Sequence, residues 1–240
     1  MSFPFSVEFG GGGSDTPSLS MVTEELSRAC ACTCITYSAH IALGGATLTL
    51  FGTEEQKQKY WTPVCTGESY GAFGLTEPNA GSDAGGTQTT AKEDGDDYVI
   101  NGSKVFITNA SYAKHLAITA ITGEKDGKKE ISAIIVPTDS EGFTIIDNYE
   151  KMGLNASNTT ELVLNNVRVP KENLLGAQGN GFRQFLVTLD GGRIGIGAMA
   201  VGIAQAAFDR ALQYSQERKQ FGKSLSKFQR TQFQLANMAL

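Results

Sequence analysis

Short runs of apolar residues, separated by turn residues, fill the chain from residue 71 to 175 without an intervening helical pattern. Strands at such close spacing predict an antiparallel barrel or sandwich. Asn101-Gly102 stands between two of these runs and predicts a tight hairpin, because this dipeptide adopts the positive φ angles that two-residue turns need. The runs expected to form strands lie within Tyr98–Thr108, Leu116–Thr122, Ile131–Val136 (joined to the preceding run across Lys125–Lys128), Leu162–Leu164 and Val167–Val169.

The residues before this region have helical character. Asp15, followed by Pro17, predicts a capped helix start. Ile35–Leu50 is rich in alanine and leucine and predicts a second helix, and Thr53 with two acidic residues after it predicts the start of a third. These patterns indicate a helical region up to about residue 70.

The residues after the strands are helical again. From Gly181 onward apolar residues recur at helical spacing, Phe221-Gly222 interrupts them, and a last helix is expected from about Lys227. We therefore expect an α+β chain: a partial N-terminal helical domain over residues 1–70, a middle β-barrel-like domain over 71–176, and the start of a C-terminal helical bundle over 177–240. The last helix is still running at Leu240, so we expect the chain to be incomplete.

Charge and hydrophobicity argue against two classes of protein, those that bind nucleic acids and those that span membranes. A formal net charge of -5 argues against a nucleic-acid partner, which needs a basic face. We expect no apolar run long enough to span a bilayer, and the N-terminus lacks the pattern of a secretory signal, so a cytoplasmic protein is the default.

The cysteines and histidines do not suggest a metal site or a hydrolase. Cys30, Cys32 and Cys34 alternate with other residues instead of forming Cys-x-x-Cys pairs, and we expect them to pack in a helical segment. His40 and His115 are the only histidines, and no Gly-x-Ser-x-Gly segment is present. We expect no bound metal.

Nucleotide-binding loops of two common kinds are also missing. Gly222-Lys223-Ser224 copies the end of a Walker phosphate loop, but Glu217 stands where the required glycine should be, and no Rossmann fingerprint follows a strand. The segment Ala72–Asp83 combines glycines with hydroxyl and turn residues. From its residues alone, it can be an ordinary interdomain turn or a loop that brings amides and hydroxyls to a polar ligand.

A resemblance favours the ligand. Ala72–Asp83 is similar to a flavin-binding loop of the acyl-CoA dehydrogenases, and Asn101–Asn109 resembles their second flavin segment. Asp190–Arg193, Glu217–Gly222 and Leu225–Gln229 continue the match in the family's order. Within the family, the residues of these motifs most resemble those of the bacterial short-chain, butyryl-CoA type.

The resemblance implies FAD as cofactor and a role for individual residues. Thr108 would hydrogen-bond near flavin N5, Phe106 would cover one face of the flavin, and Thr76 would contact its pyrimidine edge. The implied cofactor-binding residues are Phe73, Leu75, Thr76, Gly81, Ser82, Phe106, Ile107, Thr108, Arg218, Phe221 and Gln229, and the implied substrate-binding residues are Ser82, Asp190 and Arg193. Purely structural roles remain as alternatives: Phe106 can be a core residue, and Asp190 and Arg193 can form a local ion pair.

The implied activity is α,β-dehydrogenation of acyl-CoA thioesters, with electrons passed to an electron-transferring flavoprotein. Arg218 and Gln229 resemble residues that reach the FAD of a neighbouring subunit, which implies a homotetramer for the full-length protein. The family's catalytic glutamate lies in a region beyond residue 240, so we assign no base and expect this chain alone to be inactive. An acyl-CoA oxidase and a remnant that only binds or assembles remain as alternatives.

Overall fold

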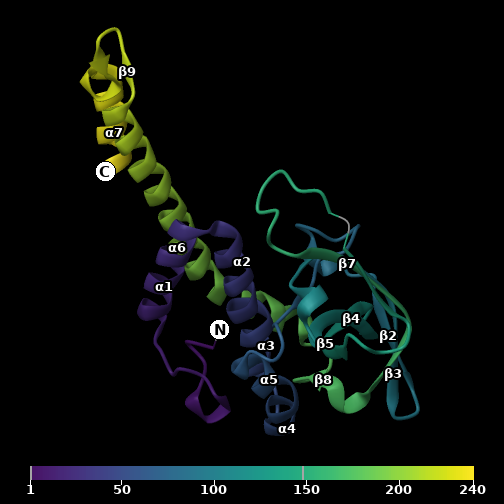
Figure 1. Ribbon diagram of the computed structural model, residues 1–240. Helices are drawn as coiled ribbons and strands as arrows, with labels where there is room; N and C mark the ends of the chain where they lie inside the picture. Colours follow the sequence, from purple (N-terminus) through teal and green to yellow (C-terminus); the bar gives the residue numbers. More distant parts are fainter. Residues whose placement is uncertain (1, 148) are drawn as a thin grey trace.

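The computed structural model describes residues 2–147 and 149–240. A β-sheet forms one end of the molecule, a cluster of helices packs beside it, and one long helix leads away from both (Figure 1). The expected α+β class is therefore confirmed.

The N-terminal helices begin where their caps predict. The Asp15 carboxylate accepts a 2.9 Å hydrogen bond from the backbone N–H of Ser18, at the start of α1 (Thr16–Ala29). Thr53 and Gln56 form a reciprocal capping box at α4 (Glu54–Gln56). The helix expected over 35–50 is present as a continuous stretch, with a π-helical turn in its middle. Its parts are α2 (Ala31–Ala39), η2 (His40–Gly45) and α3 (Ala46–Phe51), and the short elements η1 (Val7–Phe9), η3 (Lys57–Trp61) and α5 (Thr62–Thr66) complete this region.

The middle region is one eight-stranded sheet in the order β6-β7-β3-β2-β4-β5-β8, with β1 paired to β4. Most pairs are antiparallel, but β1 and β2 each run parallel to β4, so the purely antiparallel arrangement that we expected is wrong. The strands are β1 (Phe73–Gly74), β2 (Thr90–Asp94), β3 (Asp97–Thr108), β4 (His115–Lys125), β5 (Lys128–Pro137), β6 (Phe143–Ile146), β7 (Thr159–Pro170) and β8 (Leu174–Leu175), with single turns η4 (Ala84–Gly86), η5 (Ala110–Tyr112) and η6 (Lys171–Asn173) between them.

The predicted hairpin at Asn101-Gly102 is wrong. Both residues lie inside β3, because the segments before and after them pair with the same neighbour, β7. Gly102 has φ 153°, and a Cβ there would lie 2.4 Å from Thr89 Oγ1, so glycine is required by the close approach of the residue that precedes β2. The turn lies instead between Asp94 and Asp97, which are partners at the end of β2 and β3.

The C-terminal region is dominated by α6 (Gly181–Glu217). The predicted interruption at Phe221-Gly222 is present as a small hairpin of β9 (Lys219–Gln220) and β10 (Lys223–Ser224), followed by η7 (Leu225–Lys227) and α7 (Gln229–Ala239). In Figure 1, α6 starts beside the sheet, passes α1 and α2, and extends beyond them to the tip that carries β9 and α7.

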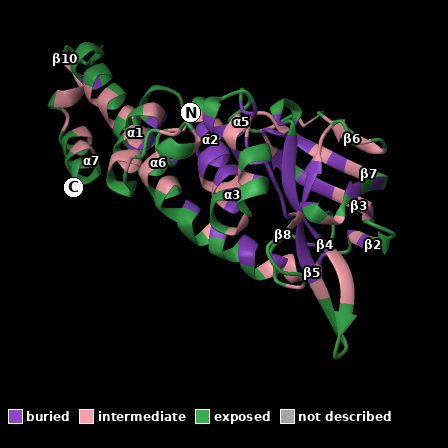
Figure 2. Cartoon of the chain, turned by 90° about the horizontal axis from the view of Figure 1, so that it is seen from below, coloured by how far each residue is buried: buried purple, intermediate pink, exposed green. Residues whose placement is uncertain are grey.

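The core ties the helices to the sheet. The rings of Phe73 in β1 and Phe185 in α6 stack with centroids 4.0 Å apart, and Trp61 packs against the ring of Phe5. Buried residues gather in the sheet and in α2, whereas the outer part of α6 and α7 are largely exposed (Figure 2). The first turns of α6 are thereby fixed against β1 and β5, where they wall the pocket described below.

One expectation from composition was too strong. Two helical stretches, Ala31–Phe51 and Gly181–Glu217, are long and apolar enough to cross a membrane by length and composition. This is weak evidence for a membrane protein, because the core helices of soluble proteins pass the same test, and half of the first window is buried inside this fold.

Candidate functional site

Two adjoining cavities lie between the helical region, the end of β3 and the first turns of α6. They measure about 390 and 740 Å³. Both are lined by Ala39, Leu43, Thr108, Leu186 and Leu189, so together they form one continuous pocket. We call the smaller part the inner cavity and the larger part the outer cavity.

The inner cavity collects most of the residues that the resemblance assigned to the cofactor. Two segments supply them: the loop after β1 and the last residues of β3. Its predicted members are Phe73, Leu75, Thr76, Gly81, Ser82, Phe106, Ile107 and Thr108. The backbone N–H of Val105 donates a 2.9 Å hydrogen bond to the carbonyl of Thr76, which joins the two segments directly.

Phe106 occupies an unusual backbone conformation. Its φ is 59°, in the left-handed region, and the pairing of β3 with β7 shifts register between Lys104 and Ile107. This bulge turns the Phe106 ring outward, where it is 63% exposed and lies 5.2 Å from the Tyr149 ring. The alternative of a core phenylalanine is therefore wrong. Strained backbone of this kind persists at ligand sites, where the surrounding structure holds it.

The donors of the inner cavity suit a planar polar ligand. Thr76, Ser82 and Thr108 each bring a hydroxyl to it. Among residues 2–147 and 149–240, none of these side-chain hydroxyls has a hydrogen-bond partner, so each is free to bind a ligand. The apolar walls and the exposed Phe106 ring can cover the faces of an aromatic ring system.

A buried ion pair lies behind the inner cavity. Lys104 Nζ is 2.7 Å from Glu77 Oε1, and the two side chains are 0% and 4% exposed. Burial lowers the pKa of Lys104 to about 8, although the Glu77 carboxylate acts in the opposite direction. Burial raises the pKa of Glu77, but the Lys104 ammonium and the Gln88 N–H outweigh it, so this pKa lies below its ordinary value. The pair was not singled out from the sequence, because neither residue departs from its local pattern.

The outer cavity is apolar, with charged residues at its edge. Asp190 and Arg193 line it from α6, and Arg193 Nη1 donates a 3.2 Å hydrogen bond to Asp190 Oδ1. Their side chains are 73% and 80% exposed, so solvent screens this pair and it contributes little to folding. The local ion pair is thus present, and both residues are also available to a ligand entering the cavity.

Sequence reasoning missed most of the lining of the outer cavity. The missed residues are apolar or small, and apart from Gly192, which lies within the Asp190–Arg193 motif, they belong to no motif. Helical spacing is the only signal that groups them, and every core helix shares it. They are Ile35, Ser38, Ala39, Ala42 and Leu43 on the α2–η2 stretch, and Leu186, Leu189, Gly192 and Ile196 on α6.

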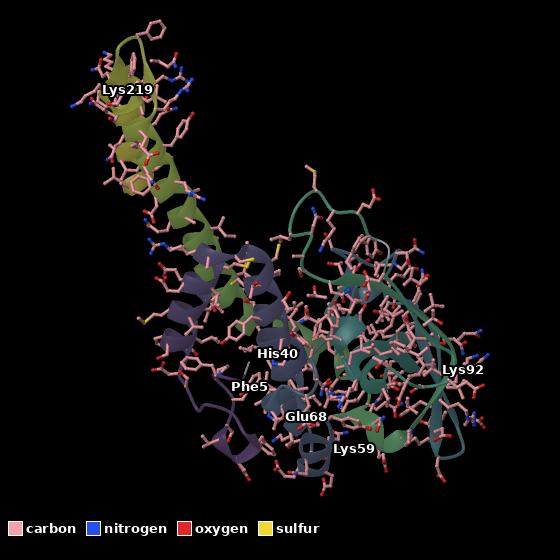
Figure 3. All side chains as sticks on the ribbon, in the orientation of Figure 1. Phe5, His40, Lys59, Glu68, Lys92 and Lys219 are labelled. Atoms are coloured by element: carbon pink, nitrogen blue, oxygen red, sulfur yellow. The ribbon has the colours of Figure 1, made fainter. Side chains whose placement is uncertain are left out.

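Arg218, Phe221 and Gln229 are not brought to the pocket. Arg218 follows the last residue of α6, Phe221 lies in the β9–β10 turn with 93% exposure, and Gln229 begins α7. Figure 3 labels the neighbouring Lys219 at the tip of the molecule, far from His40 and from Lys92 in the sheet. In a single chain these residues cannot share a ligand with the inner cavity.

The described residues contain no cluster of histidine, cysteine or acidic side chains that could hold a metal ion. Cys34 and Cys65 are buried, whereas Cys30 is exposed. Asp190 is the one carboxylate among the described lining residues of the two cavities. The site therefore offers hydroxyls, an aromatic ring and apolar walls.

Comparison with known families accounts for nearly the whole chain. Residues 1–68 match the model of the N-terminal domain of acyl-CoA dehydrogenase, residues 72–167 match that of its middle domain, and residues 179–240 match that of its C-terminal domain. Among curated proteins, a probable acyl-CoA dehydrogenase of Bacillus subtilis is 58% identical over all of this chain and 63% of its own length.

Solved structures give the same fold. Butyryl-CoA dehydrogenase from Megasphaera elsdenii matches with a TM-score of 0.93 and 45% identity, over 99% of this chain and 63% of that one. An acyl-CoA dehydrogenase complexed with FAD from Bacillus anthracis matches with a TM-score of 0.92 and 41% identity, over 98% and 40%. The chain thus spans about 63% of the length of the first two of these relatives.

Proposed function

Because this chain belongs to the acyl-CoA dehydrogenase family, a family of FAD-dependent oxidoreductases, we propose that its pocket binds FAD and an acyl-CoA thioester. The observation that carries this proposal is the β3 bulge, which presents Phe106 and Thr108 to the same cavity that Thr76 and Ser82 line. The reaction removes a proton from the α-carbon and a hydride from the β-carbon of the thioester, and we assign the base that takes the proton to none of the described lining residues. The chemistry that FAD supplies when bound is acceptance of the hydride from the β-carbon.

The inner cavity residues hold and orient the cofactor. With FAD bound, the Phe106 ring would cover one face of the flavin, and the Thr108 and Thr76 hydroxyls would donate hydrogen bonds to it. Leu186 and Leu189 of α6 line both cavities and would exclude water from the space where the two ligands meet. Fixed donors of this kind stabilise negative charge on a bound group without reorganising.

The outer cavity takes the thioester. Its apolar lining suits an acyl chain, and Asp190 with Arg193 at its edge suits the polar coenzyme A portion. We propose a short acyl chain, as in the butyryl-CoA dehydrogenase similar to this chain. We propose an electron-transferring flavoprotein as the electron acceptor. We also propose that the protein is located in the cytoplasm.

A titration of the purified protein with FAD tests the cofactor site. Phe106→Ala and Thr108→Val should each weaken FAD binding by about tenfold, since one good hydrogen bond or aromatic contact is worth about 1 to 2 kcal/mol. Tyr112→Ala is the matched control, because Tyr112 is also an exposed aromatic residue of the middle region (61%) and does not line either cavity. FAD affinity that responds to Tyr112→Ala but not to the pocket variants would place the cofactor elsewhere.

The substrate assignment needs a second measurement. With FAD bound and oxygen removed, butyryl-CoA should bind and perturb the visible flavin spectrum, and Arg193→Ala should raise the concentration required. The exposed Arg183 of the same helix provides the control, because it lines neither cavity. If Arg183→Ala has the same effect as Arg193→Ala, the polar edge of the outer cavity is not the coenzyme A site.

A further inference from the structure

The buried pair of Lys104 and Glu77 is connected to both segments that form the inner cavity. Besides the 2.7 Å contact with Glu77, Lys104 Nζ donates to the carbonyl of Leu75 at 3.3 Å and to Thr119 Oγ1 at 3.0 Å. All three donor positions of the ammonium are therefore occupied, one of them by the backbone of the loop that carries Thr76.

The oxygens of the Glu77 carboxylate also have several hydrogen-bond partners. They accept a 2.7 Å hydrogen bond from the N–H of Gln88 and further bonds from the N–H of Thr89. The backbone groups of Glu77 and Ala80 exchange two hydrogen bonds of 3.1 Å, which close the turn leading to Gly81 and Ser82. Glu77 thus links the start of β2, the turn and the lysine of β3.

Folding energy does not by itself explain such a pair. Removing two charges from water is so costly that well-packed apolar residues of the same size often stabilise a protein as well or better. Glu77 lies in the loop after β1 and Lys104 lies in β3, so the pair itself joins the two cavity segments. Thr76, next to Glu77, and Phe106, two residues after Lys104, both line the cavity. The arrangement fixes geometry at the point where the segments cross.

We propose that Lys104 and Glu77 are positioning residues, which hold the loop after β1 and the bulge of β3 at the separation that the flavin requires. This inference rests on the proposed FAD site. The pair does not touch the ligand; it fixes Thr76 through the Leu75 carbonyl and fixes Phe106 through the strand on which Lys104 lies. Displacing such a support leaves a site that is present but too loose to bind well.

The test compares Lys104→Met, Glu77→Gln and the double variant with the wild-type chain. Two quantities are measured for each: the midpoint of thermal unfolding without FAD, and the Kd for FAD together with the visible spectrum of the bound flavin. Lys171→Met is the matched control, because Lys171 forms a 2.6 Å ion pair with Glu93 in the same region, and that pair is exposed (38% and 49%).

We expect each single variant to lower the unfolding midpoint and to raise the Kd for FAD by about tenfold or more. In the double variant the unfolding midpoint should recover, because no uncompensated charge is left, whereas the Kd should stay high, because the bridge between the segments is still missing. Lys171→Met should leave both the unfolding midpoint and the Kd for FAD close to their wild-type values.

Recovery of both quantities together in the double variant would overturn the inference, since a purely structural pair predicts that result. A Kd within twofold of wild type in all variants would also overturn it. If Lys104→Met does not fold, Glu77→Gln and the double variant are compared, because glutamine keeps the shape of Glu77 and the buried amine of Lys104 can lose its proton. A wild-type chain that binds no FAD would instead refute the proposed cofactor site.

Discussion

Phe106 shows how one residue can trade stability for binding. A phenylalanine with φ 59° is held in a conformation that costs an L-amino acid about 1 to 2 kcal/mol. The residue gains little burial in return, since Phe106 is 63% exposed. The strain is compensated by the pairing of β3 with β7 on both sides of the bulge. The position is consistent with selection for a ligand rather than for folding.

Phe106→Gly should separate these two demands. Glycine adopts positive φ without strain, so the free energy of unfolding without FAD should stay unchanged or rise by up to about 1 kcal/mol. The affinity for FAD should fall, because the covering ring is lost. Urea unfolding of the FAD-free protein and an FAD titration measure the two effects. A clear loss of stability would mean that the Phe106 ring packs in the fold after all.

The histidines are a second residue-scale feature with a measurable consequence. His40 is fully buried, and its Nδ1 accepts a 2.9 Å hydrogen bond from the N–H of Gly71, so the neutral ring carries its proton on Nε2. Burial lowers the pKa of His40 to about 4, and burial likewise lowers the pKa of His115 to about 4. Both are therefore neutral in the folded protein at neutral pH.

Stability should fall in mild acid for this reason. Between about pH 6.5 and pH 4 the unfolded histidines take up protons and the folded ones do not, which costs about 1.4 kcal/mol per pH unit for each. His40→Asn keeps an acceptor for Gly71 N–H but cannot titrate. Relative to wild type, it should lose about 2 kcal/mol less between about pH 7 and pH 5 in urea unfolding experiments. Equal losses in both proteins would show that His40 is protonated in the fold.

At the scale of elements, the success of sequence reasoning depended on what each segment pairs with. Asp126-Gly127 has φ 52° and 73° and forms the two-residue turn between β4 and β5, as predicted. Asn101-Gly102 is the same kind of dipeptide but lies inside β3, because β7 is long enough to pair on both sides of it. Local turn chemistry cannot reveal the length of a distant partner strand.

The candidate site divides in a similar way. The family resemblance, now confirmed, named the flavin-loop residues and Thr108 by number, and the structure brings them to one cavity. The apolar lining from α2 and α6 could not be found, because the sequence does not say which faces of two distant helices meet. The ion pair of Lys104 with Glu77 was missed, because it is a contact between residues far apart in the chain.

The contact between α1 and α6 gives an element-scale prediction. A Cβ at Gly202 would lie 2.2 Å from the carbonyl oxygen of Glu24 and 2.0 Å from Ser27 Oγ. Gly202→Ala should therefore force the helices apart and destabilise the fold by about 1 to 3 kcal/mol. Gly197 lies on the same helix with no atom within 4 Å of such a Cβ, so Gly197→Ala should stabilise it by up to about 1 kcal/mol.

Thermal or urea unfolding of the two alanine variants checks this contrast. The comparison is internal, because both substitutions make the same chemical change on one helix. Equal effects of the two would mean that α1 does not approach α6 as closely at Gly202 as described. The 2.6 Å pair between Arg28 and Asp209, which also joins these helices, should persist in the Gly197 variant.

At the scale of the whole molecule, the pocket and the tip of α6 are separate. Arg218 and Gln229 carry polar side chains suited to phosphate and ring contacts, yet Arg218 lies at the far end of the 37-residue helix α6 and Gln229 lies beyond it, at the start of α7. An arginine fork so far from the pocket of its own chain can serve the FAD of a second copy. Exposed apolar residues on the outer part of α6, such as Val201 and Ile203, provide surface for such a contact.

Mixing two defective proteins tests this cross-copy role. One carries Phe106→Ala with Thr108→Val in the pocket, and the other carries Arg218→Ala with Gln229→Ala at the tip; each alone should bind FAD weakly. If copies pair symmetrically, half of the randomly formed dimers are mixed, and each mixed dimer has one fully intact site. About one site in four should then bind FAD with wild-type affinity after the subunits are refolded together.

The control mixture uses Arg210, an exposed arginine on α6: Arg210→Ala replaces the tip variant there. If the mixture binds no more FAD than the two defective proteins bind when measured separately, the tip of α6 does not complete a partner's site.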